Sequence, residues 1–91
     1  TNGGLVNPAQ EVGAIARAAG VTYILDACQS VGQMRIDVQA IGCDILSFTG
    51  RKFLRGPRGT GALYVNSNRL PEIEPVFLDL HAASWQSATT Y

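Results

Sequence analysis

Apolar residues recur at helical spacing near the start of the chain and mark the first predicted element. Asn7 followed by Pro8 is typical of a helix start, because an asparagine side chain caps free N–H groups and proline is tolerated in the first turn. Gly20 supplies the stop, since glycine readily adopts the left-handed conformation that ends many helices. The helix predicted between them carries one apolar face, formed by Ala9, Val12, Ile15, Ala16 and Ala19.

Three short apolar runs farther along predict β-strands over 21–25, 44–48 and 61–65. Asp37 is expected to cap a short helix that Gly42 ends, so a helix separates the first two strands. Alternation of strand and helix favours a right-handed crossover with these two strands parallel. The connection to the third strand is too short for a parallel crossover, so that strand is predicted to be antiparallel. The pattern therefore predicts an α/β fold with a mostly parallel sheet.

The pattern weakens after the third predicted strand. Asn66 or Ser67 is expected to cap another short helix, whereas residues 76–91 show no clear period. At 91 residues the chain is one domain at most, and its predicted helices are too few to cover both faces of a buried parallel sheet. We therefore expect residues 1–91 to form part of a larger domain, with 76–91 as an extension of undefined structure.

Composition and charge argue against several classes of partner. Hydrophobic residues make up 46% of the chain and charged residues 15%, which suits a buried core. Seven basic and seven acidic residues cancel, so no net field favours nucleic acid or an anionic membrane. No apolar run is long enough to span a bilayer. Cys28 and Cys43 lack metal-binding spacing, and we expect reduced thiols in a cytoplasmic protein without a metal site.

An acid and a lysine follow the first two predicted strands. Asp26 comes directly after the first apolar run, and Lys52 lies just beyond the second. Parallel strands place their carboxyl ends at one edge, where open α/β sheets bind ligands. A lysine there can hold pyridoxal phosphate (PLP) as a Schiff base, and an acid can pair with the pyridinium nitrogen. The pair therefore predicts a PLP site, whereas either residue alone would be an ordinary turn or surface group.

Three neighbouring residues extend the predicted site. Gln29 is expected to donate to the phenolic oxygen of the cofactor ring. Thr49 and Arg51 flank Gly50 and offer a hydroxyl and a guanidinium group to the phosphate. Cys28 is interpreted as a small apolar neighbour under the cofactor rather than as a nucleophile. A rival interpretation is a non-catalytic anion-binding α/β module that uses the cations Arg51, Arg55 and Arg58.

The order of these residues resembles the class V aminotransferase family of fold-type I PLP enzymes. That family includes cysteine desulfurases, selenocysteine lyases, kynureninases and isopenicillin N epimerase-like proteins. The resemblance runs from Thr1 to about Val65 and is carried by the segments 26–30, 42–52 and 56–61. The stretch from Gly50 to Gly61, which spans the lysine turn, looks most similar to the isopenicillin N epimerase-like and C–S lyase branch.

The resemblance implies that the chain is a fragment of the large domain of a fold-type I transferase, with an antiparallel strand after the lysine turn. By the resemblance, Asp26 contacts the pyridinium nitrogen and Gln29 the ring oxygen. Thr49 then binds the phosphate, and Lys52 forms the Schiff base. Thr1 falls near the family position that touches the ring oxygen. Arg51 stands where cysteine desulfurases carry a histidine, and is expected to hold the same phosphate.

The leading hypothesis is a PLP-dependent enzyme that acts on an amino acid through the lysine Schiff base, similar to class V aminotransferases. The alternatives within the family are a cysteine desulfurase or C–S lyase and an amino-acid epimerase. The resemblance also implies a homodimer in which the partner subunit helps to complete the site. Residues 1–91 alone are therefore expected to be inactive.

Overall fold

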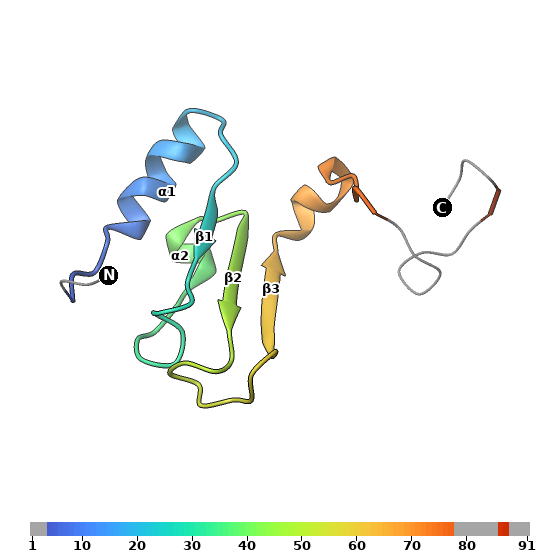
Figure 1. Ribbon diagram of the computed structural model, residues 1–91. Coiled ribbons are helices and arrows are strands. Elements are labelled where there is room, and N and C mark those ends of the chain that lie inside the picture. The colour runs from blue at the N-terminus through green and yellow to red at the C-terminus, as the bar shows by residue number, and fades with distance from the viewer. Residues whose placement is uncertain (1–3, 78–85, 88–91) are drawn as a thin grey trace.

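The chain forms a three-stranded mixed sheet in which a helix precedes each of the first two strands (Figure 1). The computed structural model describes residues 4–77 together with Gln86 and Ser87. Among these residues, no helix is both long and apolar enough to cross a membrane. The elements in chain order are α1 (Ala9–Ala18), β1 (Ile24–Asp26), α2 (Val38–Ile41), β2 (Ile45–Thr49), β3 (Gly61–Val65) and the 3₁₀-helix η1 (Ser67–Glu72).

The sheet has the order β1-β2-β3, with β1 and β2 parallel and β2 and β3 antiparallel. Both predicted pairings are thereby confirmed, and the third strand has the predicted bounds. The first strand begins at Ile24 rather than at the predicted Val21. The reason is that the N–H group of Val21 donates to the carbonyl of Ala16 and ends α1, so it takes no part in the sheet.

The ends of the helices are formed partly as predicted. The prediction that Asn7 caps α1 is wrong: no side chain caps this end, and the helix begins after Pro8. Gly20 does end α1 in a left-handed conformation with φ of 66°, and its N–H donates to Arg17 while that of Val21 donates to Ala16. Asp37 caps α2 as predicted, by accepting from the backbone N–H groups of Gln39 and Ala40.

The core is small and lies where α2 packs on the sheet. Its buried residues are Ala27, Ile41, Cys43 and Leu46. Of the predicted apolar face of α1, Ala9 and Ala16 are half-buried, whereas Val12 and Ile15 remain exposed. The buried residue of α1 is instead Gly13, which lets the helix backbone approach the end of α2.

Asp44 joins the amino-terminal ends of β1 and β2 to η1. Its carboxylate accepts from the backbone N–H of Tyr23 at 2.9 Å and from Nε of Arg69 at 2.9 Å. The hydrogen bond from Arg69 is the main reason why the pKa of Asp44 lies below its usual value, and the Tyr23 bond acts in the same direction. The two hydrogen bonds to the ionised Asp44 carboxylate therefore stabilise the folded state. Their contribution is present above the usual pKa of an aspartate, and it is lost as the pH falls through the lowered pKa of Asp44.

Gly13→Ala is expected to destabilise the protein, because the added Cβ would overlap the carbonyl oxygen of Ile41. The expected cost is about 1–3 kcal/mol in the free energy of unfolding. A loss of stability would indicate the close contact, because a glycine-to-alanine change at an open helix position raises the free energy of unfolding by about 1 kcal/mol. Thermal unfolding followed by circular dichroism measures the effect, with Ala18→Ser on the exposed side of α1 as the control. A variant more stable than the wild type would contradict the close packing of α1 on α2.

Candidate active site

The predicted acid and the predicted lysine turn lie at the same edge of the sheet. Asp26 is the last residue of β1 and pairs with Ser47, two residues before the end of β2. The ladder continues one step farther, because the N–H of Ala27 donates to the carbonyl of Ser47 at 2.8 Å. The turn that contains Lys52 leaves the same end of β2 before the chain returns in β3 (Figure 1). Parallel pairing therefore brings the two predicted groups to one edge.

The carboxylate of Asp26 is held in its ionised form. Its Oδ1 accepts from the backbone N–H of Cys28 at 2.9 Å. The pKa of Asp26 is lowered mainly by a hydrogen bond from the Cys28 thiol and next by that backbone N–H group. Burial acts in the opposite direction, and the positive charge of Lys52 lowers the pKa further. The resulting stabilisation is present above the usual pKa of an aspartate and is lost as the pH falls through the lowered value.

The thiol of Cys28 has a polar role that the sequence analysis missed. Its pKa is raised, first by the hydrogen bond to Asp26 and next by burial, while a contact with the backbone of Thr49 has the opposite effect. The raised pKa keeps the thiol protonated at neutral pH, the form in which it can donate to the carboxylate. The interpretation of Cys28 as an apolar neighbour is incomplete, because its side chain links the acid at the end of β1 to the end of β2. The tendency of aspartate to accept from the N–H two residues later was the available sequence signal.

The lysine turn is closed by its own backbone. The N–H of Gly50 donates to the carbonyl of Thr60, and the N–H of Gly56 donates to the carbonyl of Gly50, each at 2.8 Å. The N–H of Arg55 donates to the carbonyl of Lys52 at 2.9 Å. Arg55 adopts a left-handed conformation with φ of 57°, which is uncommon for a residue other than glycine. These bonds hold Lys52 within a defined loop.

The hydroxyl of Thr49 stands at the base of this turn. Its Oγ1 donates to the carbonyl of Thr60 over 3.4 Å, which is long for a hydroxyl hydrogen bond. Gly50, the next residue, is buried, and a Cβ there would overlap the hydroxyl of Thr60. The weak existing bond leaves the Thr49 hydroxyl able to donate to an incoming anion.

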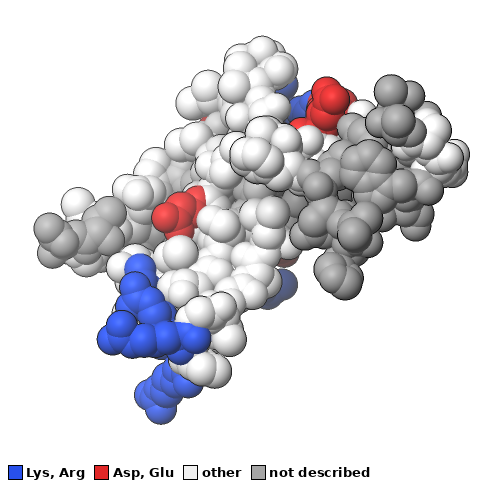
Figure 2. Space-filling view, turned by 45° about the vertical axis from the view of Figure 1, so that its right-hand side comes forward, with Lys and Arg blue, Asp and Glu red and all other residues white. Residues whose placement is uncertain are grey.

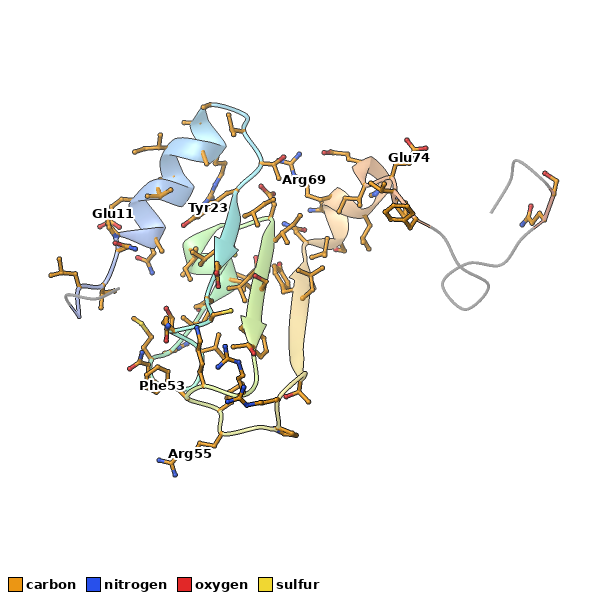
Figure 3. The ribbon with its side chains drawn as sticks, in the orientation of Figure 1. Glu11, Tyr23, Phe53, Arg55, Arg69 and Glu74 are labelled. Atoms are coloured by element: carbon orange, nitrogen blue, oxygen red, sulfur yellow. The ribbon has the colours of Figure 1, made fainter. Side chains whose placement is uncertain are left out.

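Cations gather around the lysine turn and face solvent. Figure 2 shows basic side chains clustered at one end of the molecule. Among the described residues, none of Arg51, Arg55 and Arg58 has a carboxylate oxygen within 4.0 Å. The side chain of Arg55 points away from the body of the protein (Figure 3). The exposed guanidinium of Arg51 is therefore not committed to an acidic residue of the described chain.

The remaining predicted residues are placed differently. Gln29 is exposed in the turn after β1, and together with Asp26 and Phe53 it lines a broad hollow of about 1340 Å³. Thr49, Arg51 and Lys52 do not line this hollow but belong to the adjoining end of β2 and its turn. Thr1 lies outside the described residues, and so do the sole histidine, His81, and Trp85.

Cys28→Ala is expected to raise the pKa of Asp26 towards its usual value, because the variant removes the thiol donor. Cys28→Ser keeps a side-chain donor and is the matched control, in which the pKa of Asp26 should stay low. The measurement is an NMR titration of the Asp26 carboxyl carbon in the wild type and both variants. An alanine variant that titrates as the wild type does would show that the thiol has no effect on the acid.

Comparison with known proteins places this arrangement in a family. Residues 1–85 match the class V aminotransferase family. A probable cysteine desulfurase from Methanothermobacter thermautotrophicus is 45% identical over 75 residues, which are 82% of this chain and 19% of that protein. A cysteine desulfurase from Serratia proteamaculans is 46% identical over 72 residues, which are 79% of this chain and 18% of the relative.

Solved structures agree with the sequence relatives. The apo structure of a cysteine desulfurase from Thermococcus onnurineus superposes with a TM-score of 0.86 at 32% identity, over 97% of this chain and 22% of that one. A structure of SspA in complex with cysteine gives a TM-score of 0.72 at 36% identity, over 81% of this chain and 21% of that one. The chain thus spans about a fifth of the length of these relatives. On sequence and on fold, it belongs to the class V aminotransferase family of PLP-dependent enzymes.

Proposed function

We propose that this chain supplies the acid and the lysine of a PLP-dependent cysteine desulfurase. The observation that carries the proposal is the ionised carboxylate of Asp26 at the same sheet edge as the lysine turn, in a chain of the class V family. The names of the similar proteins favour desulfuration over the aminotransferase-like activity that was the leading expectation from sequence, and over the epimerase-like branch.

The residues at this edge fit PLP by their chemistry. A pyridine nitrogen keeps its proton best beside an ionised acid, and the lowered pKa of Asp26 supplies that acid at neutral pH. PLP, when bound, supplies an electron sink for the bonds to the substrate's α-carbon. The proposed task of Asp26 is to hold the proton on the ring nitrogen, with the Cys28 thiol and N–H keeping its carboxylate in place.

The opposite end of the cofactor carries a phosphate, for which the end of β2 offers donors. Thr49 has a hydroxyl held only weakly by Thr60, and Arg51 has no carboxylate partner within the described chain. A guanidinium group binds phosphate through two parallel N–H donors and keeps its charge at every physiological pH. Arg51 is thereby a suitable replacement for the histidine that desulfurases carry at this position. Gln29 is the proposed donor to the ring oxygen, from the turn after β1.

Lys52 is the proposed point of attachment and the proton carrier. It is the only lysine among the 91 residues, and its turn is closed by the hydrogen bonds of Gly50 and Gly56. Its amine can bind the cofactor's aldehyde carbon, and once the substrate takes its place it can carry a proton to or from the substrate. A loop closed by its own backbone hydrogen bonds, with the lysine on it, suits both tasks.

The experiment is a desulfurase assay of the full-length protein with L-cysteine and dithiothreitol as the reductant of the released sulfur. The expected products are alanine and sulfide, with the dithiol oxidised to its disulfide. Lys52→Ala should abolish the visible chromophore of bound PLP and lower the rate by at least about 100-fold, because it removes both attachment and proton transfer. Glu74→Gln, a change at an exposed residue beyond η1 that does not line the hollow beside Asp26, is the control.

The outcomes separate the proposal from its rivals. Formation of pyruvate or racemised cysteine in place of alanine would reassign the reaction within the family. A wild-type protein that binds phosphate compounds through its arginines but never shows a PLP chromophore would instead favour the non-catalytic anion-binding module.

A further inference from the structure

We propose that Gly32 is a positioning residue that seats the lysine turn against the turn carrying Gln29, and so sets the spacing between Lys52 and Asp26. This inference rests on the proposed function, because the spacing matters only if one rigid cofactor must reach both residues.

The contact is between two backbones. A Cβ at Gly32 would lie 2.7 Å from the carbonyl carbon of Phe53 and 2.8 Å from the backbone nitrogen of Leu54. These atoms form the peptide link that begins one residue after Lys52. In Figure 3, Phe53 extends towards the turn that follows β1. Because the facing atoms are backbone, no flexible side chain can move aside to admit a methyl group.

Each of the two turns is closed upon itself. In the first, the N–H groups of Ser30 and Val31 both donate to the carbonyl of Ala27, which directly follows Asp26. The backbone N–H groups of Gln33 and Met34 donate to the carbonyl of Ser30. Gly32 therefore lies in a hydrogen-bonded turn that begins directly after Asp26. The lysine turn is closed in the same way, by the bonds of Gly50, Arg55 and Gly56.

No backbone hydrogen bond joins these two turns within the part of the chain that is described. Their relative position therefore depends on the sheet, on the contact of the Cys28 thiol with Thr49, and on the approach at Gly32. Since both turns are closed, a displacement at Gly32 moves the lysine turn as a unit rather than being absorbed along it. A PLP ring held at Asp26 would then no longer meet the amine of Lys52 at bonding distance.

Gly32 also has a φ of 94°, so a substitution strains its own turn regardless of the contact. Gly59 separates the two effects. Its φ is 82°, and a Cβ there would meet no atom within 4 Å. Gly59→Ala thus carries the same kind of backbone strain, within the loop that leads from Lys52 to β3, without the collision. It is the matched control for Gly32→Ala.

The test compares both variants in the full-length protein by the Kd for PLP and by the pH titration of the bound chromophore. Gly32→Ala should raise the Kd at least tenfold and shift the titration midpoint, while Gly59→Ala keeps both wild-type values. A Gly32→Ala protein with the wild-type Kd and midpoint would overturn the inference. A wild type without any chromophore would instead overturn the proposed function.

Hydrogen exchange of the wild type without cofactor covers the case in which Gly32→Ala does not fold. The amide of Leu54 faces Gly32 and is expected to exchange at least tenfold more slowly than the amide of Arg58 in the open part of the loop. Equal exchange at the two amides would show that the turns are not seated on each other, and would overturn the inference without any variant.

Discussion

The parallel pairing of β1 with β2 is the constraint on which the rest of the site depends. Leu25 pairs with Leu46 and Asp26 with Ser47, so the two strands end at one edge and in one register. A shift of one residue would turn Asp26 to the other face of the sheet. Ala27, which follows β1, and Cys43, which precedes β2, are buried with Ile41 of α2 and Leu46 of β2 in the core next to this edge.

Electrostatics then give the edge its chemical character. The carboxylate of Asp26 accepts hydrogen bonds from the thiol and the backbone N–H of Cys28 and lies near the positive charge of Lys52. These interactions outweigh the effect of burial and lower the pKa of Asp26. The same thiol interacts with the backbone of Thr49, so it links Asp26, the proposed partner of the ring nitrogen, with Thr49, the proposed donor to the phosphate. The site is therefore connected from strand to strand rather than being a set of independent residues.

Much of this arrangement could be predicted from the sequence, because it depends on local signals. Apolar runs identify the three strands, and Asp37 and Gly42 mark the short helix between the first two. The start of β1 was misplaced, since the role of the Val21 N–H depends on the Schellman-type end of α1 rather than on hydrophobicity. The contact of Cys28 with Thr49 and the close approach at Gly32 join residues more than twenty positions apart, and only the folded chain brings them together.

Peptide mapping after borohydride reduction tests whether Lys52 holds PLP at this edge. The full-length protein would be reduced with borohydride, digested with trypsin and analysed by mass spectrometry. Because trypsin cleaves after Arg51 and Arg55 but not after a modified lysine, a phosphopyridoxyl group is expected on the peptide 52–55. A phosphopyridoxyl group found only on another peptide, with 52–55 unmodified or cleaved at Lys52, would contradict this expectation.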